Sequence, residues 1–340
     1  MELASDIYIC STYYHTLMCV LRAVNRPSKF DIILTFVDSN MEDKEVYKLY
    51  QKLSESGLFN NVFIERRLPR EPRSTVEKII WRYGLYAHIV EDLVKIDFTQ
   101  YKEIYVFLDS LWLAKYFKDK KIHYNVCEDG LDFLKHISPQ SPFWYLIQPT
   151  FPFYDIRSIF KLGGQSYKYY TRCKYVKRIE VNDKQGIVLP EDDRIVEVPQ
   201  KELFKCINDQ NLRKILNIYL EEPEIFQEKR IVLILTIPLY LSGFVKTPEE
   251  QLRVYKDLVA QYETYNVVIK PHPRDSIDYS PITGARTINR YFPSELIPYI
   301  DHGHIEKYVT IISTSVLGYP KEKSVFYSSV DEFYKSIGKG

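Results

Sequence analysis

A histidine held between two prolines is the residue of this chain best placed to do chemistry. It lies in the stretch 266–275, Asn-Val-Val-Ile-Lys-Pro-His-Pro-Arg-Asp, in which residues 267–270 have the pattern of a short buried strand. Proline fixes its own φ and keeps the residue before it extended, so His272 is presented rigidly just after the strand. Ligands of open α/β sheets bind at this carboxyl edge.

Fixed positive charge flanks this histidine, because Lys270 precedes it and Arg274 follows it. A histidine between two cations resists taking up a third charge unless an anion is bound. We therefore predict a phosphate or carboxylate site in which His272 is a hydrogen-bond donor or general acid. The alternative is a stiff loop with a satisfied surface histidine.

A pair of acids follows another apolar run. Glu128-Asp129-Gly130 comes directly after residues 123–127, which have a strand pattern, and the glycine permits a tight turn. Either acid could accept a proton from a hydroxyl group. An ordinary Asp-Gly turn would have the same sequence, so the tripeptide leaves both interpretations open.

Hydroxyl groups and one further acid could complete a nucleotide site. Ser313-Thr314-Ser315 follows a third strand pattern, where hydroxyls and free backbone N–H groups can bind a phosphate or simply cap a helix. Glu295 opens a short helix pattern at 293–300. Its carboxylate could accept both hydroxyls of a ribose, or it could only stabilise the helix dipole.

Motifs of other chemistries are missing from the sequence. There is no GxGxxG, GxxxxGK[ST], HExxH or GxSxG, and the pair His302 and His304 has no evident third ligand. The absence of Asp-x-Asp argues against a transferase that depends on Mg²⁺ or Mn²⁺. We therefore expect no metal site and no cofactor.

Strand and helix patterns alternate along the whole chain, which predicts an α/β protein built from parallel sheets. In the first part we expect strands at 6–10, 30–37, 61–65, 103–108 and 123–127, with helices at 13–24, 42–56, 74–94 and 111–117. In the second part we expect strands at 230–237, 267–270, 287–288, 309–312 and 324–327, with helices at 200–220, 247–262, 293–300 and 331–337.

These patterns predict two Rossmann-like domains that face each other across a cleft. We place the N-terminal domain at 1–150, on the acceptor side, and the C-terminal, nucleotide-sugar-binding domain at 201–340. Prolines at 139, 142, 149 and 152 interrupt an aromatic stretch, and residues 151–200 are expected to form an irregular connector, with a lid or an acceptor platform as alternatives.

Composition narrows the function classes. The chain has 340 residues, enough for two domains, and a net charge of +1, which gives no overall field for nucleic acid or an anionic membrane. Five widely spaced cysteines without a CxxC favour a reducing compartment. No secretory signal or membrane-spanning run is visible, so we expect a cytoplasmic protein, with peripheral contact to the inner face of the cell membrane left open.

Taken together, Glu128-Asp129-Gly130, His272-Pro273 and Ser313-Thr314-Ser315 resemble, in order and spacing, the motifs of bacterial sialyltransferases of the lipooligosaccharide and capsule family. The resemblance extends from the first strand to about Ser315. It implies a GT-B fold and metal-free, inverting transfer of sialic acid from CMP-sialic acid to a galactose-terminated surface glycan, as in polysaccharide biosynthesis.

The resemblance also implies roles for individual residues. His272 would contact the CMP phosphate and assist its departure, Ser313 and Ser315 would bind the same phosphate, and Glu295 would hold the ribose. The full set of expected substrate-binding residues is Lys270, Pro273, Arg274, Glu295, Ser313, Thr314, Ser315 and Thr236.

The resemblance does not decide which residue is the catalytic base. Asp129 or Glu128 would accept the proton of the acceptor hydroxyl, but some family members draw the base from an acid upstream of the histidine, which here leaves Glu250 as a candidate. The alternatives to sialyl transfer are a GT-B transferase that uses UDP-galactose or UDP-glucose, and a non-catalytic protein that binds a nucleotide or glycan. The family also contains dimers, so a homodimer is left open.

Overall fold

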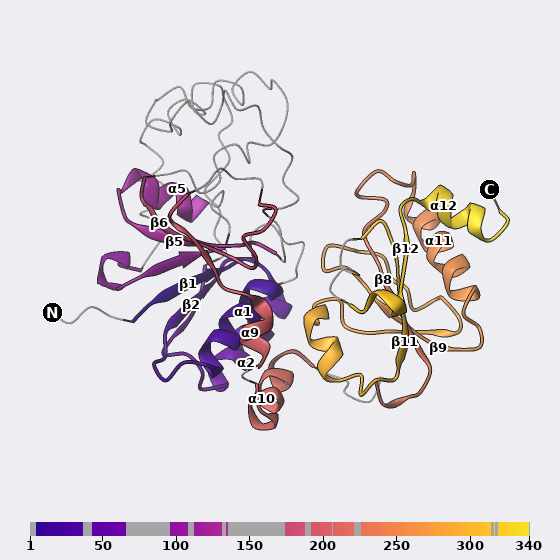
Figure 1. The fold of residues 1–340 in the computed structure, drawn as a ribbon, viewed down its shortest axis with the longest axis horizontal. Coiled ribbons are helices and arrows are strands. Elements are labelled where there is room, and N and C mark those ends of the chain that lie inside the picture. The colour runs from indigo at the N-terminus through magenta and orange to yellow at the C-terminus, as the bar shows by residue number, and fades with distance from the viewer. Residues whose placement is uncertain are drawn as a thin grey trace, which may run out of the picture. The chain divides into compact units, whose positions relative to one another are not determined.

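The chain forms two compact units in the computed structural model, the first reaching Ile215 and the second beginning at Leu216. The structure describes residues 5–36, 43–65, 96–107, 112–130, 134, 174–187, 192–205, 207–220, 226–313, 316 and 319–339. The helix expected at 74–94, the whole segment 139–173, Thr314 and Ser315 lie outside these residues. Each unit is a parallel-sheet α/β structure (Figure 1).

The first unit is built on a seven-stranded parallel sheet in the order β3-β2-β1-β4-β5-β6-β7. Its strands are β1 (Ile7–Cys10), β2 (Asp31–Leu34), β3 (Val62–Ile64), β4 (Ile104–Val106), β5 (Tyr124–Cys127), β6 (Val176–Val181) and β7 (Ile195–Glu197). Strands β1, β2, β4 and β5 are buried along their whole length, as expected for a sheet covered on both faces.

Helices follow most of these strands. They are α1 (Tyr13–Val24), α2 (Asp43–Glu55), α5 (Trp112–Asp119), α9 (Gln200–Lys205) and α10 (Asp209–Tyr219). Thr12 caps α1, its hydroxyl accepting a hydrogen bond from the backbone N–H of His15 at 3.2 Å. Helices α1 and α9 contact each other beside the sheet (Figure 1).

The segment between the two expected domains contains more regular structure than its sequence suggested. The described part of residues 151–200 contributes β6 and β7, which extend the first sheet beyond β5. Lys177 and Arg178 interrupt the apolar alternation of β6, so the sequence pattern did not predict this strand. The single helix expected at 200–220 is two helices, because Asn208 starts a second one by accepting from the N–H of Asn211 at 2.8 Å.

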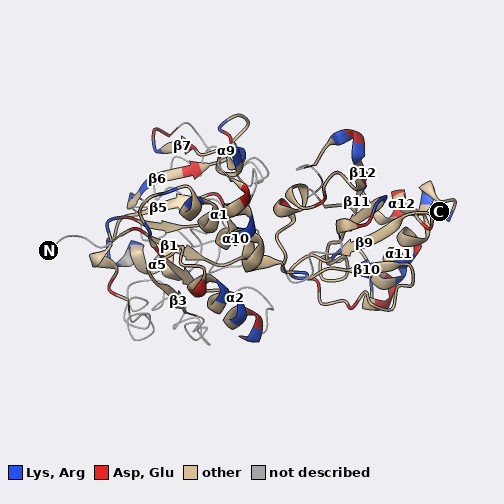
Figure 2. Ribbon diagram, turned by 90° about the horizontal axis from the view of Figure 1, so that it is seen from below, with Lys and Arg blue, Asp and Glu red and all other residues tan. Residues whose placement is uncertain are grey.

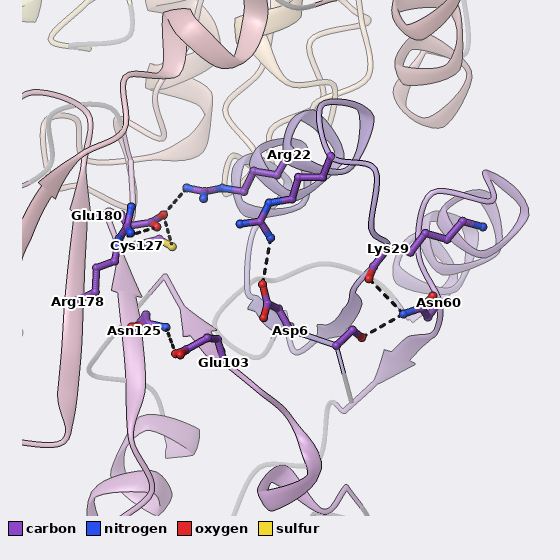
Figure 3. Close-up of polar contacts among 11 residues, drawn as sticks. Asp6, Arg22, Lys29, Asn60, Glu103, Asn125, Cys127, Arg178 and Glu180 are labelled. Carbon is purple, nitrogen blue, oxygen red and sulfur yellow. Dashed lines mark hydrogen bonds and ion pairs between the residues drawn. The ribbon is translucent and has the colours of Figure 1, made fainter. Parts of the chain in front are cut away.

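A buried ion pair fastens α1 to the sheet (Figure 3). The Arg22 guanidinium lies 2.7 Å from the Glu180 carboxylate, and their side chains are 10% and 5% exposed. The Cys127 thiol donates to the same carboxylate at 3.5 Å. Charges taken this far from water need partners, so α1, β5 and β6 are held in one arrangement.

The second unit has a five-stranded parallel sheet in the order β10-β9-β8-β11-β12. Its strands are β8 (Ile231–Leu235), β9 (Asn266–Lys270), β10 (Ala285–Thr287), β11 (Ile305–Ile311) and β12 (Ser324–Tyr327). Its helices are α11 (Pro248–Ala260) and α12 (Val330–Ser336), with 3-10 turns that include η4 (Ser294–Tyr299). Thr247 caps α11, with Pro248 at its first position, as the sequence predicted.

Strand order locates the ligand edge of each sheet. Chain order reverses between β1 and β4 in the first sheet and between β8 and β11 in the second. Ligands of open α/β sheets bind at the carboxyl ends of strands at such switch points. Acidic and basic residues are interspersed over both units (Figure 2), so any anion site depends on local groups. Among the described residues, no helix is long and apolar enough to cross a membrane.

Candidate active-site residues

The turn after β9 holds His272 through its backbone and its ring. The backbone N–H of His272 donates to the Thr236 hydroxyl at 3.2 Å, and its carbonyl accepts from the N–H of Asp275 at 2.8 Å. Its Nδ1 accepts from the backbone N–H of Arg274 at 3.1 Å. A ring nitrogen that accepts carries no proton, so the network assigns the proton of the neutral ring to Nε2.

This environment keeps the imidazole of His272 neutral. Burial, and to a smaller extent the charges of Arg274 and Lys270, together lower the pKa of His272 from 6.5 to about 4. Without a bound anion the ring is therefore an N–H donor at neutral pH, and it has no second proton to give. Of the two roles expected from the sequence, the geometry favours hydrogen-bond donor over general acid.

Lys270 holds the backbone of the turn that follows β9. Its side chain is buried, and its Nζ donates to the carbonyl oxygens of Pro271 and Arg290, each at 2.8 Å. Burial lowers the pKa of Lys270 to about 7, with a smaller raising effect from Glu295. Near pH 7 Lys270 is therefore only partly protonated, so it is not the fixed cation expected from the sequence, and its Nζ mainly holds the backbone of Pro271 and Arg290. The side chain of Arg274 is exposed.

A buried polar network that the sequence analysis missed supports the same turn. The carboxylate of Asp275, 1% exposed, accepts from the Thr236 hydroxyl at 2.9 Å, from Gln251 Nε2 at 3.0 Å and from the Tyr279 hydroxyl at 2.6 Å. Because the Thr236 hydroxyl donates to Asp275 and accepts from His272, it positions the histidine. The sequence feature that could have indicated this network is Gln251, a polar residue on the apolar face of α11.

Tyr279→Phe tests this network, because it removes the hydroxyl that bonds Asp275 and also accepts from Gln251 at 2.7 Å. A lost hydrogen bond to a charged group costs about 1.5–3 kcal/mol, so we expect the free energy of unfolding to fall by about that much. Urea denaturation measures it. Tyr240→Phe, at an exposed tyrosine, is the control and should leave the unfolding free energy unchanged. Equal effects of the two changes would contradict the network's importance.

Ser313 and Glu295 lie at the ends of neighbouring structural elements. Ser313 lies two residues after the end of β11 and is half-buried, and Ile312 between them has φ of 68°. A β-branched residue in that region is strained, and such strain concentrates at functional sites. Glu295 is the second residue of η4; burial raises its pKa, and Lys270 and the Ser294 hydroxyl, 3.4 Å from Oε2, oppose the rise. Thr314 and Ser315 lie outside the described residues.

In the first unit, Asp129 contacts a histidine that the sequence analysis did not single out. Asp129 follows β5, and its side chain is 25% exposed. Its Oδ1 lies 2.7 Å from Nε2 of His15, a fully buried residue in the first turn of α1. Position in the sequence gave no sign of this pair, because 114 residues separate its members.

The other two acids considered as bases are occupied by backbone groups. Glu128 is buried, and its two oxygens accept from the N–H groups of Leu134 at 2.9 Å and Asn182 at 2.7 Å. Glu250 lies in the first turn of α11, where it accepts from the N–H of Lys246 at 2.7 Å. Such contacts hold an acid in place as a cap, so the geometry favours Asp129 as the available carboxylate.

Each unit therefore presents a different chemical group at the carboxyl edge of its sheet. The second presents a neutral imidazole donor with cations around it, which suits an anionic leaving group. The first presents a half-exposed carboxylate oriented by a histidine, which suits proton removal from a hydroxyl. Among the residues described here, no three His, Cys, Asp or Glu side chains form a group that could hold a metal.

This pair of parallel-sheet α/β units is the architecture of GT-B glycosyltransferases and related epimerases. The chain matches the model of glycosyltransferase family 52 over residues 80–331. It therefore belongs to that family, a bacterial sialyltransferase family. The resemblance inferred from its motifs and the expected GT-B fold are confirmed.

Solved structures agree on the fold. A 2,6-sialyltransferase from Photobacterium sp. JT-ISH-224, solved with CMP and lactose, is 13% identical, with a TM-score of 0.55 over 96% of this chain and 71% of that one. UGT71G1 of Medicago truncatula, complexed with UDP-glucose, is 10% identical, with a TM-score of 0.53 over 99% of this chain and 89% of that one.

A sequence relative comes from Haemophilus influenzae. It is an uncharacterized protein, 28% identical to this chain over 160 residues. The match covers 46% of this chain and about half, 51%, of that protein. It adds a bacterial relative but no activity.

Proposed function

We propose that this protein transfers sialic acid from CMP-sialic acid to a galactose-terminated surface glycan, with inversion at the anomeric carbon and without a metal. The observation that carries the proposal is the neutral imidazole of His272, which offers its Nε2–H at the ligand edge of the sheet in a member of family 52. Such a donor suits a phosphate that gains charge as it leaves.

On the donor side, the bond between the anomeric carbon and the phosphate oxygen breaks, and its electron pair leaves with CMP. His272 donates to the growing phosphate charge, and Lys270 and Arg274 supply positive potential. CMP leaves as a monophosphate, which needs less help than a diphosphate. We propose that Ser313, with Thr314 and Ser315, adds donors to the same phosphate and that Glu295 accepts from the ribose hydroxyls.

On the acceptor side, a galactose hydroxyl attacks the anomeric carbon. As the new carbon–oxygen bond forms, the hydroxyl proton passes to the carboxylate of Asp129, and the glycan keeps the oxygen. Proton, leaving group and new bond are then all accounted for, and no step requires a metal ion.

The reaction is tested by incubating the protein with CMP-sialic acid and lactose in the presence of EDTA. We expect sialyl-lactose and CMP in equal amounts, at the same rate as without EDTA. Loss of activity that Mg²⁺ restores would contradict the metal-free mechanism. Transfer from UDP-galactose or UDP-glucose, with none from CMP-sialic acid, would establish the alternative donor instead.

CMP binding should also take up protons. The phosphate brings negative charge to His272, which favours the charged ring, so the pKa of His272 must rise above its ligand-free value of about 4 when CMP binds. Between the two values the complex holds more protons than the free protein, and affinity rises as pH falls. Calorimetry at about pH 5.5 in buffers of different ionisation enthalpy measures the uptake. His272→Gln, the control, should take up fewer protons, and equal uptake by both proteins would contradict the assignment.

A further inference from the structure

The ring of His15 is fixed in every direction by its neighbours. Its Nδ1 accepts from the backbone N–H of Ser11 at 3.0 Å, and its ring stacks on Phe107 with centroids 4.4 Å apart and planes 9° apart. Its Nε2 lies 2.7 Å from Oδ1 of Asp129 and 3.1 Å from the Asp129 carbonyl oxygen. Three strand ends are joined in this way, because these neighbours follow β1, β4 and β5.

These contacts determine the direction of the hydrogen bond. Since Ser11 N–H can only donate, Nδ1 of His15 accepts and the ring proton lies on Nε2, aimed at Asp129. A backbone N–H cannot accept a proton from Nδ1, so His15 has no second partner to which a proton could be relayed. The ring therefore acts on Asp129 as a fixed donor.

We propose that His15 is the positioning residue for Asp129, and that it holds Oδ1 so that Oδ2 faces the acceptor hydroxyl. This rests on the proposed function, in which Asp129 removes that proton. Within the described residues, no side chain or backbone group bonds to Oδ2, whereas Oδ1 is held by a ring that is fully buried. A histidine needed only for packing would not require an N–H aimed at a carboxylate that is 25% exposed.

A matched pair of substitutions separates positioning from packing. Gln and Met are unbranched and of similar size, but only Gln keeps an N–H donor at the reach of Nε2. We expect His15→Met to lower kcat for sialyl transfer to lactose by about 10²-fold, the scale of a misplaced catalytic group. We expect His15→Gln to retain most of the wild-type kcat, and neither change to alter the KM for CMP-sialic acid.

Both variants are first compared with wild type by circular dichroism and thermal unfolding. Equal kcat values for His15→Met and His15→Gln, in folded proteins, would overturn the proposal, as would losses that appear only in the donor KM. If His15→Met does not fold, ¹⁵N NMR of the histidine rings in the wild-type protein decides. A proton on Nδ1 of His15 would overturn the proposal, and a proton on Nε2 that shifts in Asp129→Asn would support it.

Failure of the proposed sialyl transfer can be distinguished from failure of the role proposed for His15. If wild type transfers sialic acid and Asp129→Asn does not, but the His15 variants behave alike, only the role of His15 is lost. If wild type transfers nothing from CMP-sialic acid, the proposed function and the inference that rests on it both fall.

Discussion

Replacing His272 by alanine should lower kcat for sialyl transfer by about 10²-fold or more, since removal of a donor aimed at developing charge costs about that much. The loss falls on kcat because the donor's hydrogen bond strengthens as charge grows on the leaving phosphate. Steady-state kinetics with CMP-sialic acid and lactose measure it.

Two controls make this result specific. His123→Ala replaces an exposed histidine of the first unit and should leave kcat unchanged. His272→Gln retains an amide N–H and should recover part of the lost activity. Near-normal turnover by a folded His272→Ala protein would show that this imidazole does not assist the departure of CMP.

Asp129→Asn is expected to have the second large effect, a loss of about 10²–10⁴-fold in kcat, the range of general-base catalysis. The amide keeps the shape of the side chain but cannot accept the hydroxyl proton. The donor KM should stay close to the wild-type value, because the donor phosphate is assigned to residues of the second unit. Product formation from CMP-sialic acid and lactose at saturating donor provides the measurement.

The other two acids provide the matched controls for Asp129. Glu250→Gln should keep near-normal kcat, because this side chain is occupied by the backbone N–H of Lys246 at the start of α11. Glu128→Gln should reduce the free energy of unfolding by about 1–3 kcal/mol, because one of its two backbone N–H partners loses an acceptor. If Glu250→Gln loses more activity than Asp129→Asn, the base belongs to the second unit.

The two expected losses of activity arise from different parts of the reaction. His272 acts on the group that leaves and Asp129 on the group that attacks, so their variants should differ in rescue by donors with better leaving groups. Such a donor should restore more activity to His272→Ala than to Asp129→Asn, because only the first lacks help for departure. This comparison separates the two roles within one assay.

Local sequence was sufficient to predict most elements, and it singled out His272, whose role in the site stays a prediction. Strand β8 is a continuous apolar run followed by a threonine, and β9 has an apolar centre of three residues and is followed by a proline. Thr247-Pro248 marks the start of α11. These features are encoded by neighbouring residues, through propensity, burial pattern and the fixed φ of proline. Strand β6 was not predicted, because its own apolar pattern is weak. Pairing with β5, which is distant in sequence, stabilises it.

Only the tertiary structure supplied the contacts that favour one candidate residue over another. The choice among Asp129, Glu128 and Glu250 depends on backbone N–H groups and on His15, none of which the three short motifs contain. Burial and two cations made His272 a neutral donor, although its sequence allowed an acid as well. The physical reason is that hydrogen bonding and desolvation depend on which groups folding brings within a few ångströms, and that information is distributed over the whole chain.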